Sequence, residues 1–193
     1  MKKYSTILIV LAVVAALDLL SAAFLKSVMP TWTLAFPENS HRIRHEVYHH
    51  GLAANRLVED IWGGRAYPLA VNSLGFKDRA VREVPLTSET KRVLFIGDSF
   101  TEGIGFVFGD SFFGHVAKAL MARGIDALNA GVVSYAPSAI YNKLRYFLLE
   151  RGLEIDEAVI LVDISDAFGE ATLYKLSGDG DGRLVVPPHE EKP

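Results

Sequence analysis

The sequence contains no cysteine among its 193 residues. This absence excludes a disulfide framework, a thiolate zinc site and a cysteine nucleophile. The chain also has no large excess of either charge, because its formal net charge is -3. No basic surface of the kind that binds nucleic acid is therefore expected. Hydrophobic residues make up 50% of the chain, which is enough for one domain with a proper core.

Two lysines, Lys2 and Lys3, precede a long apolar run from Ile7 to Leu25 that is interrupted by Asp18. A helix needs roughly 20 apolar residues to cross a bilayer, and this run is of that length. Lysines ahead of such a run place the N-terminus in the cytoplasm and the rest outside. We expect residues 1–28 to be a signal anchor that crosses the cell membrane once. The alternative is a cleaved signal peptide, but no clean small-x-small site follows the first apolar run.

Residues 29–90 are expected to form a juxtamembrane connector and a lead-in of loops and short strands, because proline, glycine and asparagine recur there. Four histidines fall within ten positions: His41, His45, His49 and His50. Imidazoles can bind zinc, but the spacing is irregular and no carboxylate-rich segment accompanies it. We prefer the interpretation that this is a polar segment lying over the domain. No metal ion and no cofactor is expected.

A buried strand is predicted from Lys91 to Ile96, and it ends in a turn that carries a serine. Gly97 allows the backbone to turn sharply. Asp98 and Ser99 then follow at the carboxyl end of the strand, where open α/β sheets bind ligands. Ser99 is therefore either a nucleophile or the cap of the next helix.

Helix and strand patterns alternate after this turn. The sequence predicts helices over residues 111–123 and 138–151 and strands over residues 125–130 and 157–162. This alternation indicates a parallel sheet with right-handed crossovers. Beyond Asp166 we expect irregular chain, with a turn cluster over residues 177–182.

Residues 97–103, Gly-Asp-Ser-Phe-Thr-Glu-Gly, resemble the first signature block of the SGNH/GDSL hydrolases, which are esterases and lipases with a serine nucleophile. Residues 72–78 are similar to the lead-in of membrane-anchored bacterial members. Residues 129–131, Asn-Ala-Gly, and 162–166, Val-Asp-Ile-Ser-Asp, fall where the second and third blocks lie. The resemblance covers residues 45–185 in outline. It implies a flavodoxin-like three-layer α/β/α fold with a parallel sheet, in which the third strand lies beside the first.

The resemblance also implies roles for individual residues. Ser99 would attack an ester carbonyl, and water would hydrolyse the resulting acyl-enzyme. The oxyanion hole would use the Ser99 amide, the backbone amide of Ser134, and the side chain of Ser165 in place of an asparagine. A serine hydroxyl reaches less far, and losing one such donor costs about 2.7–4 kcal/mol. Alternatively, Asp163, Ser165 and Asp166 are only turn and cap residues.

The last family block, Asp-x-x-His, is missing, so no general base is found. His189 has no aspartate three residues before it, and His115 lies inside the first predicted helix. We therefore expect the chain to be the N-terminal portion of a longer protein, inactive alone, with residues 91–193 forming an incomplete α/β domain. The strand over residues 158–162 would then present an open edge.

Three functions remain open from the sequence. The first is a membrane-anchored, extracytoplasmic ester hydrolase, periplasmic or external, acting on acyl esters or O-acetyl groups; similar anchored proteins often act on envelope polysaccharide. Its partners would be an ester or O-acylated glycan substrate and the membrane. The second is a non-catalytic domain of the same fold that binds a glycan or a protein in the cell envelope. The third, a nucleotide-binding protein suggested by Gly103-x-Gly105, is weak because no complete phosphate-binding motif is present.

Overall fold

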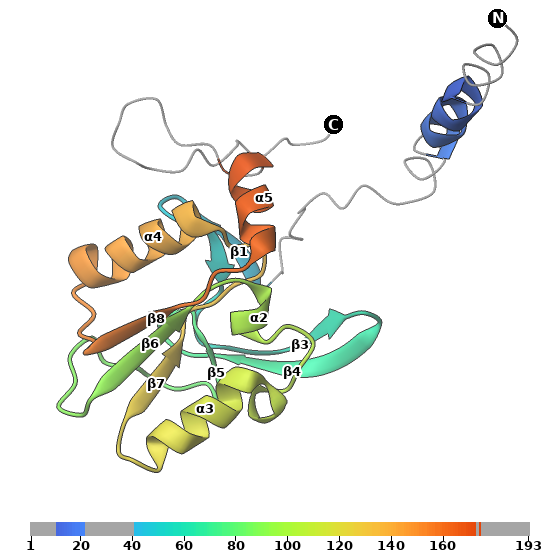
Figure 1. Ribbon diagram of the computed structural model, residues 1–193. Helices are drawn as coiled ribbons and strands as arrows, with labels where there is room; N and C mark the ends of the chain where they lie inside the picture. Colours follow the sequence, from blue (N-terminus) through green and yellow to red (C-terminus); the bar gives the residue numbers. More distant parts are fainter. Residues whose placement is uncertain (1–10, 22–40, 173, 175–193) are drawn as a thin grey trace, which may run out of the picture. The chain divides into compact units, whose positions relative to one another are not determined.

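The computed structural model describes residues 11–21, 41–172 and 174 (Figure 1). The chain divides into two compact units, Met1–Glu38 and Asn39–Pro193. In the first unit, residues 11–21 form a helix whose side chains are exposed. Within these described ranges, no helix is both long enough and apolar enough to cross a membrane. The apolar run from Ile7 to Leu25 lies partly outside them, so the anchor stays a prediction.

A six-stranded sheet with the order β3-β4-β5-β7-β6-β8 organises the second unit. The strands are β3 (Arg56–Trp62), β4 (Arg65–Val71), β5 (Lys77–Asp78), β6 (Arg92–Ile96), β7 (Asp126–Asn129) and β8 (Glu157–Ile160). β6 pairs in parallel with β7 and β8 on its two sides, whereas β3, β4, β5 and β7 pair antiparallel in succession. A separate two-stranded ribbon joins β1 (Arg42–His45) and β2 (His49–Leu52).

Helices cover both faces of the parallel part of the sheet (Figure 1). They are α2 (Ser99–Glu102), α3 (Phe112–Met121), α4 (Pro137–Arg145), continued by a π-helical turn (Tyr146–Glu150), and α5 (Ile164–Thr172); a short 3-10 helix spans Phe108–Asp110. Successive side chains of β6 point to opposite faces. Phe95 packs against Phe113 of α3, whereas Leu94 shares a second core with Ile140 of α4. The parallel strands therefore lie between two helical layers.

The strand order β7-β6-β8 confirms the prediction that the third parallel strand lies beside the first. Helix α3 begins after Ser111, whose side chain accepts a hydrogen bond from the Gly114 amide at 3.0 Å, as expected for an N-cap.

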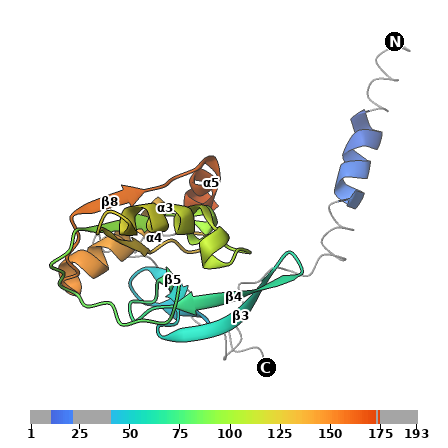
Figure 2. The same ribbon diagram turned by 90° about the horizontal axis from the view of Figure 1, so that it is seen from below.

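The prediction of parallel strands is confirmed for β6, β7 and β8, but the sheet as a whole is mixed. The lead-in segment contributes a hairpin of two seven-residue strands, β3 and β4 (Figure 2). Its turn is Gly63-Gly64, with φ angles of 57° and 77°. Positive φ at both central residues fits the right-handed twist of paired strands, and this favours the hairpin. Strands β3, β4 and β5, which come from the segment of residues 29–90, thus belong to the same sheet as β6, β7 and β8. This segment was expected to form loops and short strands.

The expectation of irregular chain beyond Asp166 was wrong for residues 167–172, since α5 spans Ile164–Thr172. The turn cluster expected over residues 177–182 lies outside the described residues. Asp163 precedes this helix, and its Oδ1 accepts a hydrogen bond from the Ser165 amide at 2.6 Å. An aspartate that satisfies an amide of the first turn stabilises the start of a helix. The polar residues after β8 therefore begin a helix and do not form only a turn.

A lysine is buried in the larger core. Lys143 of α4 donates from Nζ to the Ala130 carbonyl at 2.9 Å. The rings of Tyr48, Phe76 and Tyr135 surround this amine, with centroids 5.0–5.4 Å from Nζ. Burial lowers the pKa of Lys143 from its ordinary value to about 7. Folding therefore places the amine where its charged form is disfavoured.

We predict that the free energy of unfolding rises with pH between about 7 and 10. Burial lowers the pKa of Lys143 to about 7 and that of Lys77 to about 8, whereas an unfolded lysine titrates near 10.4. Between these values the unfolded chain binds more protons, so raising the pH favours the folded state. The measurement is the thermal unfolding midpoint as a function of pH.

Lys143→Met keeps an apolar stem and removes one titrating amine, so it should make the rise shallower. A midpoint that stays flat or falls from about pH 7 to about pH 9 in the parent chain would contradict the account. An equal slope in parent and variant would exclude Lys143 as a source.

Candidate functional site

Two backbone segments lie very close together just after the central strand β6. A Cβ atom built on Gly97 would lie 2.7 Å from the Leu161 carbonyl oxygen and would also meet the Thr101 side chain. Any larger residue would push apart the segments that follow β6 and β8. Gly97 therefore brings the predicted first and third blocks together.

Ser99 opens the one-turn helix α2 at the carboxyl end of β6 and is partly exposed. Asp98 caps this helix, because its Oδ1 accepts from the Phe100 amide at 2.9 Å. The Ser99 hydroxyl lies 3.4 Å from Oδ2 of Asp98. The helix ends at Gly103, which has a left-handed φ of 70°. The capping role that the sequence left open for Ser99 thus belongs to Asp98.

The predicted second block packs directly against α2. Asn129, the last residue of β7, donates from Nδ2 to the Thr101 carbonyl at 2.8 Å and accepts from the Gly131 amide at 3.1 Å. A Cβ on Gly131 would lie 2.7 Å from Cβ of Thr101. The loop after β7 is therefore fixed against the helix that carries Ser99.

Ser134 lies at the far end of this loop in a left-handed conformation, with φ of 64°. Its carbonyl accepts a hydrogen bond from the Tyr174 hydroxyl. Glycine adopts this region without steric cost, so the backbone conformation at Ser134 is one that glycine also favours. The role of the Ser134 amide as an oxyanion donor stays a prediction.

Three carboxylates gather at the third block. Oxygens of Asp98, Asp163 and Asp166 lie within 4.8 Å of one another, a spacing that could hold a cation. Asp166 accepts from the Asp163 amide at 2.9 Å, and Asp163 accepts from the Ser165 amide, so both also serve as caps. Burial raises the pKa of Asp166, and the charges of Asp98 and Asp163 add to this effect. The cluster makes the surroundings of Ser99 acidic.

Ser165 is exposed in the first turn of α5. Its hydroxyl donates to Oδ1 of Asp163 at 2.6 Å. This geometry matches the alternative in which Asp163 and Ser165 act as turn and cap residues. The proposed oxyanion role of Ser165 would require the hydroxyl to leave Asp163.

The histidines of the lead-in segment pack within the fold. His45 stacks on the Tyr48 ring with centroids 3.6 Å apart. His50 is buried, and its Nε2 lies 2.7 Å from the Val133 carbonyl oxygen. Burial lowers the pKa of His45 to about 4 and that of His50 to about 3. These rings are therefore neutral near pH 7, and they support the fold.

Two histidines follow Ser99 in the sequence. His115 is exposed on α3. His189 lies outside the described residues. In the ranges that the structure describes, the Ser99 hydroxyl is bonded to Asp98 and to no histidine ring.

Sequence reasoning missed a buried ionic network beneath α2. Glu102 is fully buried, and its two oxygens accept from Nη1 and Nη2 of Arg42 at 3.0 and 2.7 Å. Its Oε2 also accepts from the Val133 amide at 2.7 Å. Arg42 donates a further bond to Asp60 of β3 at 3.0 Å. We call Glu102, Arg42, Asp60 and the Val133 amide the Glu102 network.

The guanidinium and the carboxylates of the Glu102 network favour one another's charged forms. Burial alone would lower the pKa of Arg42, but the carboxylates of Glu102 and Asp60 outweigh it and raise the pKa. Burial alone would raise the pKa of Asp60, but hydrogen bonds from His41 and Tyr67 and the charge of Arg42 hold it below its usual range. The ion pairs are therefore formed at neutral pH.

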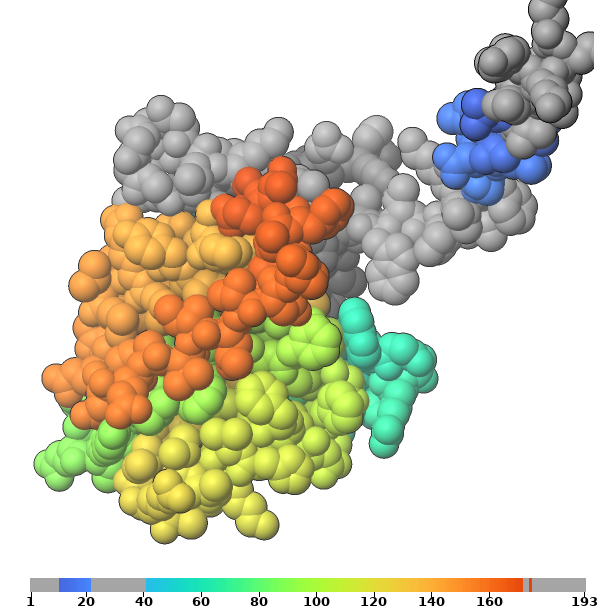
Figure 3. Space-filling model, in the orientation of Figure 1, coloured from blue at the N-terminus to red at the C-terminus, as the bar shows by residue number. Residues whose placement is uncertain are grey.

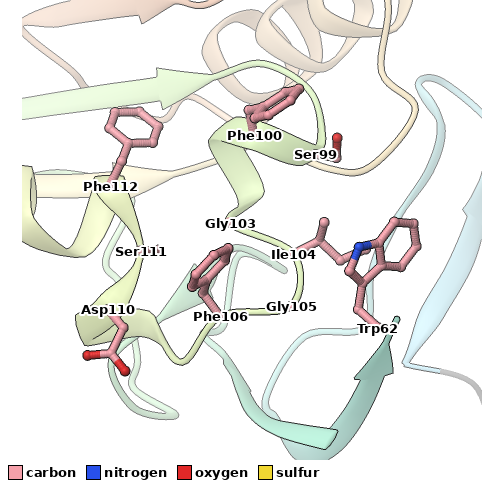
Figure 4. A pocket seen from close by; sticks show the side chains of 10 residues that line it. All are labelled: Trp62, Ser99, Phe100, Gly103, Ile104, Gly105, Phe106, Asp110, Ser111 and Phe112. Atoms are coloured by element: carbon pink, nitrogen blue, oxygen red, sulfur yellow. The ribbon is translucent and has the colours of Figure 1, made fainter. Parts of the chain in front are cut away.

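A groove opens beside Ser99, with a cavity volume of about 570 Å³ (Figure 4). Its lining residues are Trp62, Ser99, Phe100, Gly103, Ile104, Gly105, Phe106, Asp110, Ser111 and Phe112. Lys77 supports its floor, because its buried Nζ donates to the carbonyls of Gly103 and Phe106 at 2.7 and 2.8 Å. Ser99 thus lies at an open, largely apolar depression.

No family model and no curated protein match this chain. Among solved structures, the crystal structure of AlinE4, an SGNH-hydrolase family esterase, is similar with 24% identity and a TM-score of 0.37, covering 42% of this chain and 44% of that chain. An aspartate-to-alanine variant of AlinE4 matches with 24% identity, the same coverage and a TM-score of 0.36. The similarity spans less than half of each solved chain.

We predict that Glu102→Ala destabilises the fold by about 3–5 kcal/mol, because it leaves the Arg42 charge buried without its main partner. Glu102→Gln keeps the shape and the acceptor for the Val133 amide, so it should cost less. The free energy of unfolding in urea measures both losses.

A surface pair provides the matched control. Lys91 Nζ lies 2.6 Å from Glu157 Oε1, but the two side chains are 47% and 58% exposed. Glu157→Ala should therefore cost less than about 1 kcal/mol. Equal losses for Glu157→Ala and Glu102→Ala would refute the importance of the buried network.

Proposed function

We propose that this chain carries the nucleophile of an SGNH/GDSL-type serine ester hydrolase, and that Ser99 is this nucleophile. The observation that carries the proposal is the position of Ser99 at the carboxyl end of β6. The connection from β6 runs to β7 on one side, and the connection from β7 crosses back to β8 on the other side, so the strand order reverses around β6. Ligands of open α/β sheets bind in the crevice at such a switch point.

The chemistry follows from a partly exposed hydroxyl at this place. Ser99 Oγ attacks the ester carbonyl carbon, the bond to the alcohol oxygen breaks, and the alcohol leaves with a proton. Water then attacks the acyl-enzyme and releases the acid. A serine hydroxyl needs a base to accept its proton. That base takes the proton from Ser99 Oγ and passes it to the leaving alcohol. In the described residues Asp98 Oδ2 lies 3.4 Å from the hydroxyl.

The oxyanion of the proposed reaction is stabilised by backbone amides. The Ser99 amide begins α2, and the Ser134 amide belongs to the loop that Asn129 fixes against that helix. Ser134 needs only its backbone for this role, and its left-handed φ of 64° fits a position where the resemblance to SGNH/GDSL hydrolases implies a glycine. Ser165 is the third donor in the proposal, once its hydroxyl releases Asp163.

The proposal includes a location and a substrate class. Lys2, Lys3 and the apolar run from Ile7 to Leu25 support a single-pass anchor with the domain outside the cytoplasm. The substrate is an acyl ester or an O-acylated glycan of the cell envelope. This part rests on the sequence alone.

A second candidate function is a non-catalytic domain of the same fold that binds a ligand in the cell envelope. The observation that favours it is the Ser165 hydroxyl, which is bonded to Asp163 at 2.6 Å in the place of an oxyanion donor. The two candidates differ in whether Ser99 reacts.

We predict that a fluorophosphonate probe labels the protein as its own cell makes it and does not label its Ser99→Ala variant. The phosphonyl group is captured only by an activated serine oxygen, so labelling reports the nucleophile. Hydrolysis of p-nitrophenyl acetate should fall at least about 1,000-fold in the same variant. Gel fluorescence and released nitrophenolate measure the two effects.

Ser88→Ala is the matched control, since Ser88 hydrogen-bonds to Thr90 in a surface turn. It should label like the parent. Absence of labelling in the parent protein as its own cell makes it would favour the binding domain. Labelling that persists in Ser99→Ala would assign the reaction to another residue.

A further inference from the structure

The groove beside Ser99 gathers exposed aromatic side chains from separate segments. Trp62 comes from the tip of the β3–β4 hairpin, Phe100 from α2, Phe106 from the following loop and Phe112 from α3. Their exposed fractions are 48%, 73%, 54% and 45%. Figure 3 shows the hairpin (turquoise) against the yellow-green surface of residues near 100–112. A contiguous apolar patch of this kind on a folded domain marks a binding surface.

Internal contacts hold this groove open in the absence of any ligand. Lys77 fixes the loop by donating to the Gly103 and Phe106 carbonyls. Gly105 has φ of 80°, and a Cβ on it would lie 3.0 Å from Cδ1 of Trp62, so the indole rests directly on the backbone. The Ser111 hydroxyl donates to the Phe108 carbonyl at 2.8 Å. The polar groups of the floor are thus satisfied within the protein, and the surface offered to a ligand is apolar.

The charge of the lining argues against an anionic ligand. Asp110 is the charged residue among those that line the groove, and it is exposed. Figure 4 shows Ser99 and Asp110 at opposite ends of the lining in that view. A neutral apolar group therefore fits the walls, whereas a carboxylate or phosphate would meet a like charge.

The size of the groove exceeds the needs of an acetyl group. A volume of about 570 Å³ lies within the range of about 300–1,000 Å³ that is typical of small-molecule pockets. An acetyl group would leave most of it filled with water against aromatic rings. A chain of several methylene groups would displace this water, and each buried methylene favours binding.

We propose that the groove binds an apolar chain of a neutral ester, longer than acetyl, whose carbonyl lies at Ser99. This inference rests on the proposed function, because Ser99 lines the same groove. It assigns the substrate to medium-chain esters in preference to O-acetyl esters. The chain is carried either by the acyl group or by the alcohol of the ester, and the experiment separates the two.

The test is a binding titration in the full chain that needs no catalysis. Ser99→Ala prevents turnover, and Trp32→Phe leaves Trp62 as the one tryptophan, since the sequence has two. Methyl octanoate, octyl acetate and ethyl acetate are titrated while Trp62 emission is recorded. We expect saturable binding of an eight-carbon ester at least about tenfold tighter than that of ethyl acetate. Preference for methyl octanoate places the acyl group in the groove, and preference for octyl acetate places the alcohol there.

Substitutions of the wall identify the site. Phe106→Ala should weaken binding about tenfold, because it removes a ring from the wall, and Phe106→Leu should restore most of it. Tyr141→Ala is the matched control, since Tyr141 is a 61% exposed aromatic residue of α4 outside the groove. Its binding should equal that of the parent.

The outcomes separate this inference from the proposed function. Equal affinity for eight-carbon esters and ethyl acetate, or equal losses in Phe106→Ala and Tyr141→Ala, would overturn the groove as a chain-binding site even if Ser99 is labelled. Selective binding of an eight-carbon ester with no fluorophosphonate labelling would keep the groove and overturn the nucleophile.

Discussion

The buried carboxylate of Glu102 joins three segments that are distant in the sequence. It accepts hydrogen bonds from Arg42 of β1 and from the Val133 amide in the loop after β7, while it belongs to α2 itself. A buried charge is tolerated only when it is paired and its oxygens are satisfied. Because the same residue holds the loop and the helix, the surroundings of Ser99 depend on this one group. The lead-in strands are therefore part of the site's support.

The local backbone conformations around Ser99 also hold its helix and the neighbouring loop in place. Gly97 permits the segments after β6 and β8 to touch. Asp98 is the N-cap of α2, so Ser99 is the first residue of that helix. Asn129 fixes the loop that leads to Ser134. A short helix of one turn has little stability of its own, so these contacts and the Glu102 network maintain its place. A reactive hydroxyl needs such rigid support to meet a carbonyl.

Much of the parallel core follows from short-range signals in the sequence. The apolar run before Gly97, the cap at Ser111 and the alternation of strand and helix predicted the right elements. The hairpin β3–β4 was missed because its outer strand is mostly exposed and shows little apolar alternation. The Glu102–Arg42 pair joins residues 60 positions apart, and no local pattern reveals such a contact. The resemblance around Ser99 implied no role for Glu102.

The most direct test of the account is to trap the covalent intermediate. The protein as its own cell makes it is mixed with p-nitrophenyl octanoate, quenched in acid during turnover and digested with trypsin. Fragment spectra then locate the acyl group within the peptide of residues 93–118 that contains Ser99. The account predicts an octanoyl ester on Ser99. An unmodified peptide during measurable turnover, or an acyl group on another residue, would contradict it.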